Sequence, residues 1–100
     1  MGTHCLIRIK GIDYVQIYKH WDGYPSEMYQ KLVEWNADFE RNRPGDPNYK
    51  FAQLLRASAK LFDDTSPYTG WGVEPLLDET ETGLSVDYIY TLTEDGVTYI

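Results

Sequence analysis

Apolar and polar residues alternate near the start of the chain in the pattern of two β-strands. Cys5, Ile7 and Ile9 fall on one face of residues 5–10, and residues 14–20 are rich in residues that favour strands. Only a few residues separate the two segments, so we expect them to pair as a β-hairpin.

The sequence leaves the register of this hairpin open. A two-residue turn that begins with glycine suits the turn chemistry and would pair Lys10 with Asp13. The pattern of apolar side chains favours Lys10 opposite Tyr14, because Ile7 then faces Ile17.

Two amphipathic helices are expected in the middle of the chain. The first covers residues 26–42, with Ser26 as its N-cap, and the second covers residues 49–62, with Asn48 as its N-cap. The first helix carries one apolar stripe at helical spacing, made of Met28, Leu32, Trp35 and Phe39.

The last third of the chain returns to strand patterns. Residues 84–92 show the clearest alternation, and an Asp-Gly turn at 95–96 leads into a strand at 97–100. A short strand at 73–77 is expected at a sheet edge, because Pro75 has no N–H to donate to a neighbouring strand.

The order of these elements predicts the fold class. Two β-hairpins joined through two helices predict an α+β fold, in which one antiparallel sheet is built from the hairpins and both helices pack on one face. A chain of 100 residues suits one hydrophobic core, so we expect residues 1–100 to form a single domain.

Composition narrows the class of protein. An apolar fraction of 42% and a charged fraction of 25% are typical of a globular protein. Cys5 is the only cysteine, which excludes an internal disulfide and a cysteine-based zinc site. The chain has neither a signal-peptide pattern nor an apolar run long enough for a membrane span, so we expect a cytoplasmic protein, in the host cytoplasm if it is viral.

Charge is divided unevenly along the chain. Residues 1–60 hold all nine Lys and Arg and have a net charge of +2, whereas residues 61–100 hold nine acids, no base and a net charge of −9. This division disfavours direct nucleic-acid binding by the acidic part. It is consistent either with solubility or with a surface for a basic partner. The candidate partner-binding residues are Asp78, Glu79, Glu81 and Asp87.

The densest group of functional residue types lies between the second strand and the first helix. Trp21 and Tyr24 could stack on a planar ligand such as a nucleotide, and His20 and Asp22 could orient it. Trp71, flanked by glycines, could close on the same ligand. The simpler alternative is that the turn is structural and the aromatic rings belong to the core.

A metal site depends on the hairpin register. If Lys10 faces Tyr14, then His4 lies opposite His20, and Asp22 follows two residues later. Two histidines and a carboxylate are the ligand set of non-haem iron sites. The other register separates the histidines, so we expect no metal and no cofactor.

Residues 18–25 contain the motif His-Trp-Asp-Gly-Tyr-Pro. With the N-terminal hairpin, Glu34-Trp35-Asn36, a Gly-Trp-Gly loop and an acidic C-terminal hairpin, this motif resembles a group of short uncharacterised proteins of phages and archaea. The resemblance covers most of the chain. It implies an accessory protein encoded by a virus or mobile element, with a role against a host defence system.

The sequence therefore predicts a non-catalytic binding protein. The expected partner is a host protein with a basic surface or a nucleotide-like small molecule, without a membrane. The alternative is a small enzyme that uses His20 and Asp22 as an acid–base pair or metal site. The sequence leaves open whether the chain forms a homodimer.

Overall fold

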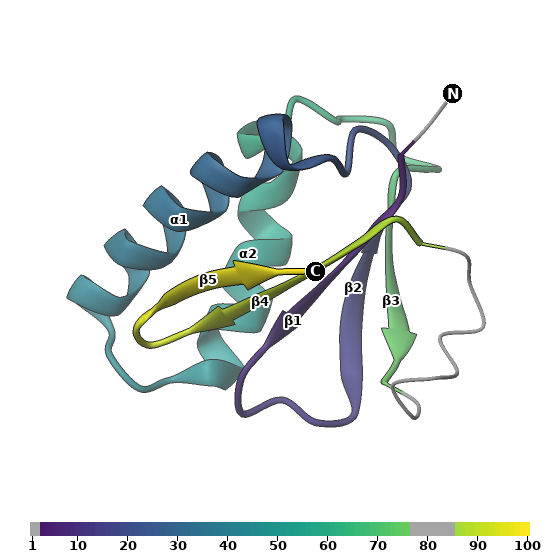
Figure 1. Cartoon of the computed structure of the whole chain (residues 1–100). Helices are drawn as coiled ribbons and strands as arrows, with labels where there is room; N and C mark the ends of the chain where they lie inside the picture. Colours follow the sequence, from purple (N-terminus) through teal and green to yellow (C-terminus); the bar gives the residue numbers. More distant parts are fainter. Residues whose placement is uncertain (1–2, 77–85) are drawn as a thin grey trace.

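The computed structural model describes residues 3–76 and 86–100, which contain two helices and a five-stranded sheet. All seven expected elements are present, with shifted ends. In chain order they are β1 (Cys5–Ile9), β2 (Val15–Lys19), α1 (Pro25–Asn42), α2 (Pro47–Leu61), β3 (Trp71–Pro75), β4 (Tyr88–Thr93) and β5 (Gly96–Tyr99) (Figure 1). The fold class is therefore α+β.

The sheet has the strand order β3-β2-β1-β4-β5. Both predicted hairpins, β1 with β2 and β4 with β5, are antiparallel. The prediction of a wholly antiparallel sheet is wrong, because β1 and β4 pair in parallel at the centre. Alternation within a strand decides which face is buried, but it does not decide the direction of one hairpin relative to another.

The N-terminal hairpin has the register that its apolar pattern favoured. Cys5 pairs with Lys19 and Ile7 pairs with Ile17, a register that places Lys10 opposite Tyr14. The predicted two-residue turn, which would have paired Lys10 with Asp13, is therefore wrong. Burial of the apolar face outweighed the preference of a short glycine turn.

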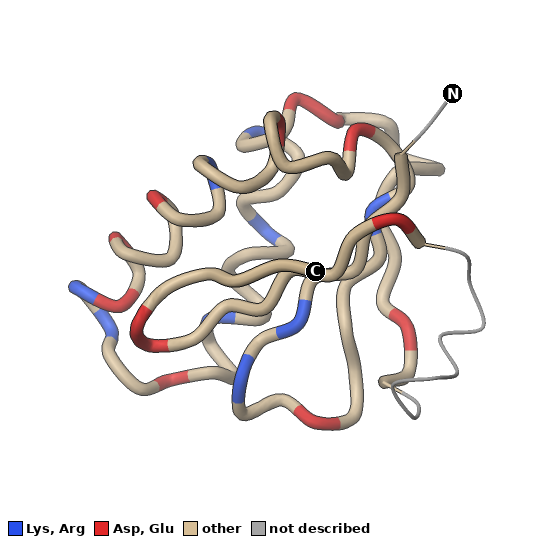
Figure 2. Tube along the Cα trace, in the orientation of Figure 1, with Lys and Arg blue, Asp and Glu red and all other residues tan. Residues whose placement is uncertain are grey.

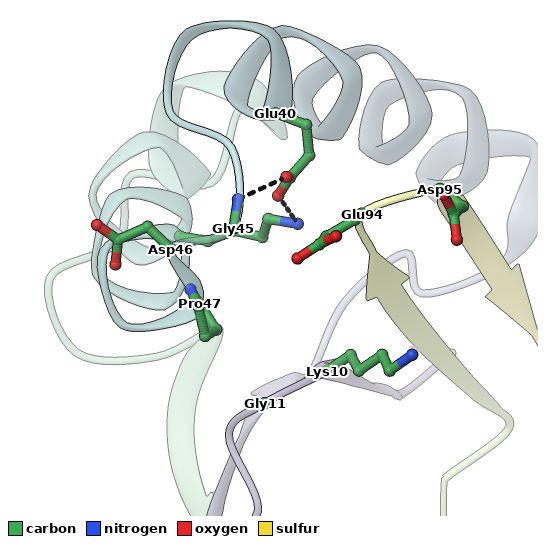
Figure 3. Close-up of a pocket in the computed structure, with 9 residues that line it drawn as sticks. Lys10, Gly11, Glu40, Gly45, Asp46, Pro47, Glu94 and Asp95 are labelled. Carbon is green, nitrogen blue, oxygen red and sulfur yellow. Dashed lines mark hydrogen bonds and ion pairs between the residues drawn. The ribbon is translucent and has the colours of Figure 1, made fainter.

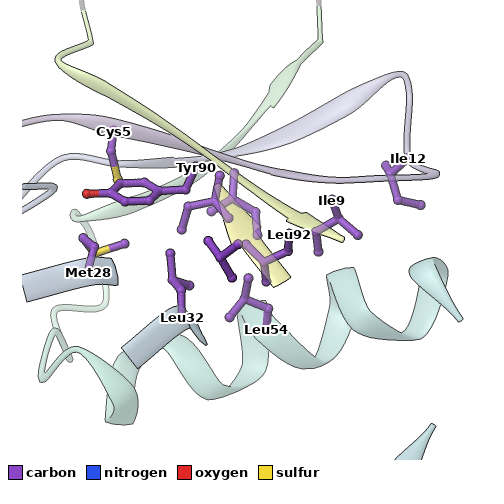
Figure 4. Close-up of a cluster of buried hydrophobic side chains, with 11 residues drawn as sticks. Cys5, Ile9, Ile12, Met28, Leu32, Leu54, Tyr90 and Leu92 are labelled. Atoms are coloured by element: carbon purple, nitrogen blue, oxygen red, sulfur yellow. The ribbon is translucent and has the colours of Figure 1, made fainter. Parts of the chain in front are cut away.

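Both helices cover the same face of the sheet, as predicted. The core lies between this helix layer and the sheet (Figure 4). Its members are nearly inaccessible to solvent and come from both helices and four strands. They are Cys5, Ile7, Ile9, Ile12, Ile17, Met28, Leu32, Leu54, Tyr90, Leu92 and Val97. This layer fixes β2 and the ends of the two helices relative to one another.

The stripe predicted for α1 is correct in its first half only. Met28 and Leu32 are fully buried, whereas Trp35 and Phe39 are half-buried and stack with ring centroids 5.4 Å apart. Asn36 takes the next buried position, where its side-chain amide donates to the Thr93 carbonyl at 2.9 Å. A polar residue can occupy this place because it satisfies a backbone acceptor in the β4–β5 turn.

The two helices begin earlier than expected, and neither predicted N-cap is used. Proline occupies the first turn of each helix, where a missing N–H costs nothing. Asp46, rather than Asn48, caps α2 by accepting the Tyr49 N–H at 3.3 Å. Tyr24, rather than Ser26, precedes α1 and makes no side-chain cap.

Candidate functional site

The turn between β2 and α1 is built around an Asp-Gly pair. Asp22 has a φ of +53°, a left-handed conformation that aspartate tolerates better than most residues. The Gly23 N–H donates to the Thr3 carbonyl at 2.7 Å, and a Cβ at this position would lie 2.8 Å from both that oxygen and the Cys5 Cβ. Close packing against the start of β1 therefore requires glycine and holds the turn in place.

This turn forms one wall of a pocket of about 200 Å³. The other wall is the segment that follows α2, far away in sequence. The lining residues, which we call the Trp21 pocket, are Lys19, Trp21, Asp22, Phe62, Asp63 and Asp64. Figure 2 shows acidic positions on both turns, which lie at the same end of the molecule.

Lys19 lies at the inner end of this pocket and is 2% exposed. Its Nζ donates to the Trp21 carbonyl and lies 5.6 Å from the ring centroid of Phe62 and 5.5 Å from that of Trp71. Burial lowers the pKa of Lys19, although the nearby Cys5 thiol and several carboxylates oppose that shift. Aromatic faces and one carbonyl thus replace water around a buried cation.

The three aspartates of the pocket have no cationic partner within the described residues. Asp22 and Asp63 are exposed, whereas Asp64 is half-buried, and its one carboxylate oxygen that accepts no hydrogen bond from the described part of the chain is itself buried beside Gly70. The pocket also lies at the carboxyl end of α2, where the helix dipole is negative. The whole rim therefore favours a positive charge.

Three of the five predicted ligand-binding residues meet here. Trp21 and Asp22 line the pocket, and Trp71 lies behind its inner end, with its ring centroid 5.6 Å from that of Phe62. Tyr24 and His20 are not among the lining residues. The Tyr24 carbonyl instead accepts the first N–H groups of α1.

His20 belongs to a group of rings with His4 and Tyr18, and its ring also contacts that of Trp21 edge-on, with centroids 4.4 Å apart. Its Nδ1 lies 2.7 Å from the Tyr18 hydroxyl, and its ring stacks on that of His4 with centroids 4.3 Å apart. The register thus brings the two histidines together. Among residues 3–76 and 86–100, no three His, Cys, Asp or Glu side chains are placed to hold a metal ion.

The predicted acidic partner surface can be placed only in part. Asp87 is exposed, its carboxylate accepts the His4 N–H at 3.1 Å, and its own N–H donates to the His4 carbonyl at 2.9 Å. This aspartate therefore extends the pairing of β4 with β1. The other three residues, Asp78, Glu79 and Glu81, lie outside the described residues.

A second cavity of about 260 Å³ lies at the opposite ends of the helices, lined by Lys10, Gly11, Glu40, Gly45, Asp46, Pro47, Lys50, Glu94 and Asp95 (Figure 3). The Glu40 carboxylate accepts the Gly45 N–H at 3.2 Å and forms a close ion pair with the Lys50 ammonium, which is 3% exposed. The buried charges of this cavity already satisfy each other. We therefore interpret it as a structural connection between α1, α2 and the β4–β5 turn.

Sequence reasoning missed four residues of the Trp21 pocket, which are Lys19, Phe62, Asp63 and Asp64. One signal was present for Lys19, because it continues the alternation of Val15 and Ile17 on the face of β2 that packs against the helices. A lysine at a core-facing strand position is unusual, because a buried ammonium needs polar or aromatic partners in place of water.

Comparison of the chain with protein families, curated proteins and solved structures finds no match. The site must therefore be interpreted from its own geometry. In the described part of the chain, neither helix is long and apolar enough to cross a bilayer.

Proposed function

We propose that the protein is a non-catalytic binding protein, and that its Trp21 pocket holds a cationic side chain of a partner protein. The observation that supports this proposal most strongly is the arrangement around Trp21. An indole that is 43% exposed lies beside three carboxylates that have no cationic partner within the described residues. The two features together match an arginine or lysine side chain.

An arginine side chain suits this pocket for three physical reasons. Its guanidinium can stack on the Trp21 ring. Its N–H groups can donate charge-assisted hydrogen bonds to the exposed carboxylates of Asp22 and Asp63. Exposed tryptophans and arginines are also the residues that contribute most to binding at protein interfaces.

The pocket gives less support to a nucleotide-like ligand. Three carboxylates repel a phosphate group, and Lys19 is the single cation among the lining residues. It also gives less support to the enzyme alternative. Asp22 lines the pocket, whereas His20 is not among the lining residues and its Nδ1 bonds to the Tyr18 hydroxyl.

The class of partner follows from charge and from the resemblance noted in the sequence. A chain of net charge −7 attracts a basic protein surface at long range and accelerates association. Proteins that bind nucleic acid carry basic surfaces, so in the setting of a phage or mobile element we infer a host protein of that kind as the partner. We infer an accessory role against that class of protein.

The test compares two small probes by NMR. Acetyl-arginine amide represents the cationic side chain and AMP represents the nucleotide, and both are titrated into ¹⁵N-labelled protein at constant ionic strength. We expect the arginine probe to shift the Trp21 indole signal and the amide signals of Asp63 and Asp64. Trp21→Ala should remove these shifts and keep the dispersion of a folded protein.

The control and the contradicting outcome are equally specific. Tyr14→Ala removes an aromatic ring that is 69% exposed and does not line the pocket, so it should bind the probe as the parent does. Shifts at the pocket caused by AMP and not by the arginine probe would reject the proposal in favour of a nucleotide site.

A further inference from the structure

Lys19 places a resident positive charge at the inner end of a pocket whose rim is negative. It is the single basic residue among the lining residues, and it is held there by the strand register. Cys5 pairs with it from β1, and Trp71 pairs with it from β3, so its side chain is directed to the helix face of the sheet. Any cation that enters the pocket approaches this ammonium.

The surroundings of Lys19 stabilise its charge poorly. No carboxylate within the described residues lies in ion-pair distance of its Nζ, and its recorded hydrogen-bond acceptor is the Trp21 carbonyl. A buried ammonium with one acceptor and two aromatic faces is less well solvated than in water. It is therefore the group in this pocket whose charge is most easily lost.

We propose that Lys19 determines how tightly the Trp21 pocket holds a cation, because its ammonium repels a second positive charge that enters the pocket. This inference rests on the proposed function. With Lys19 charged, the pocket has one positive and three negative groups and holds a guest weakly. With Lys19 neutral, the repulsion disappears and the guest binds more tightly.

Several other charged or titratable groups lie near Lys19, and their effects on binding must be distinguished from that of Lys19. On α1, Glu27 contributes a negative charge, and Lys31 lies with its Nζ 5.7 Å from the Phe62 ring centroid. Burial raises the pKa of Cys5 to about 12, which keeps the thiol neutral up to strongly alkaline pH.

Two tyrosines and one histidine lie close to Lys19 in the chain. Burial and nearby negative groups raise the pKa of Tyr18 and of Tyr24, so both phenols ionise above their usual range near 10. The His20 ring contacts that of Trp21 edge-on, with centroids 4.4 Å apart. A pH range from about 8 to 10 lies above the usual range of histidine and below the ordinary pKa of lysine.

The direction of the pH effect follows from the lowered pKa of Lys19. Burial lowers this pKa from the ordinary value of 10.5, so the Lys19 ammonium loses its proton at a lower pH than an unperturbed lysine does. Affinity for a guanidinium, which keeps its charge throughout, should rise as pH increases. The probe itself contributes nothing to the pH dependence.

The experiment measures the affinity of acetyl-arginine amide between about pH 8 and pH 10 for the parent and two variants. Lys19→Met is neutral at every pH, and Lys19→Arg is charged at every pH. We expect the parent to bind more tightly as pH rises, Lys19→Met to bind about tenfold more tightly than the parent at pH 8, and Lys19→Arg to bind weakly, both with flat profiles. Lys31→Gln is the matched control and should keep the slope of the parent.

The outcomes separate this inference from the function on which it rests. A parent that binds the probe with a flat pH profile, or a folded Lys19→Met variant that binds no more tightly, would overturn the role of Lys19 and leave the cation site intact. Absence of binding in the parent and in all variants would overturn both. If Lys19→Met does not fold, the contrast in slope between the parent and Lys19→Arg decides the question.

Discussion

The Tyr90 hydroxyl donates a hydrogen bond of 2.7 Å to the Gly23 carbonyl. Tyr90 is a fully buried residue of the interior strand β4, whereas Gly23 belongs to the turn that forms one wall of the Trp21 pocket. Burial raises the pKa of Tyr90 above its usual range, so the phenol remains a donor at every physiological pH. The core thus fixes the backbone that carries Trp21.

Removing this hydrogen bond should weaken the fold to a limited extent. Tyr90→Phe keeps the ring but leaves the Gly23 carbonyl without its donor, so we expect a loss of about 1–2 kcal/mol in the free energy of unfolding. Urea denaturation of parent and variant measures it. Tyr99→Phe, at a half-exposed ring of β5, is the control and should change stability by less than about 0.5 kcal/mol. Equal losses in the two variants would mean that the hydrogen bond from Tyr90 to the Gly23 carbonyl does not contribute to stability.

Gly23 itself should tolerate no side chain. A Cβ at this position would lie 2.8 Å from the Thr3 carbonyl oxygen, which belongs to the backbone and cannot move aside cheaply. Gly23→Ala should therefore cost several kcal/mol and lower the melting temperature sharply. Gly72→Ala, where a Cβ would meet nothing within 4 Å, is the matched control in calorimetry. A Gly23→Ala melting temperature like that of the control would contradict the close approach of the turn to β1.

The phase of α1 can be tested with two substitutions. Leu32 is fully buried, so Leu32→Ala should cost about 2–5 kcal/mol, whereas Trp35 is half-buried and Trp35→Ala should cost about 1–2 kcal/mol. Chemical denaturation with a common slope gives both values. A larger loss at Trp35 than at Leu32 would mean that the helix is rotated toward the stripe expected from the sequence.

The ion pair between Glu40 and Lys50 should make stability depend on acid pH. Burial raises the pKa of Glu40, but hydrogen bonds from Lys50 and from the Gly45 N–H outweigh burial, and the net pKa is lowered from 4.5. A carboxyl whose folded pKa is depressed contributes stability that is present above its unfolded pKa. That contribution is lost as pH falls through the lower, folded value.

Glu40→Gln should therefore lose about 3 kcal/mol at pH 7, because it leaves a buried ammonium without its partner. Its stability should also fall less steeply than that of the parent when pH decreases below about 4.5. The double variant Glu40→Gln with Lys50→Met removes both charges and should recover most of the loss. Parallel pH profiles for parent and Glu40→Gln would show that this pair does not contribute to acid sensitivity.

The sequence predicted those parts of the fold that depend on burial within one element or one hairpin. The pairing of Ile7 with Ile17 followed from the apolar pattern, because a slip of one residue would expose that face. The parallel pairing of β1 with β4 could not be predicted in this way. It depends on how the chain crosses from β3 at the sheet edge to the centre, and neither strand carries a signal of direction.

The candidate site was predicted in the same partial way. Trp21 and Asp22 stood out because aromatic and acidic residues lie together in the chain. Asp63 and Asp64 did not, because they approach Trp21 only through the packing of α2 on the sheet. His20 was adjacent in sequence, yet it does not line the pocket, because its Nδ1 bonds to the Tyr18 hydroxyl while its ring contacts that of Trp21 edge-on.

The central claim is that the carboxylates of the Trp21 pocket bind a cation, and neutralising two of them tests it most directly. Asp22 and Asp63 both have left-handed backbone, with φ of +53° and +51°, and asparagine adopts that conformation without strain. The double variant Asp22→Asn with Asp63→Asn therefore removes charge and keeps the turns. Asp13→Asn with Asp95→Asn makes the same change in net charge at exposed positions away from the pocket.

The measurement is the affinity of a short arginine-containing peptide for the parent and both double variants, by calorimetry at low and at moderate salt. The account predicts that the pocket variant binds about tenfold more weakly than the parent and with a smaller salt dependence, whereas the control stays within about twofold. A pocket variant that binds as tightly as the parent, or a control that loses as much affinity, would contradict the cation site.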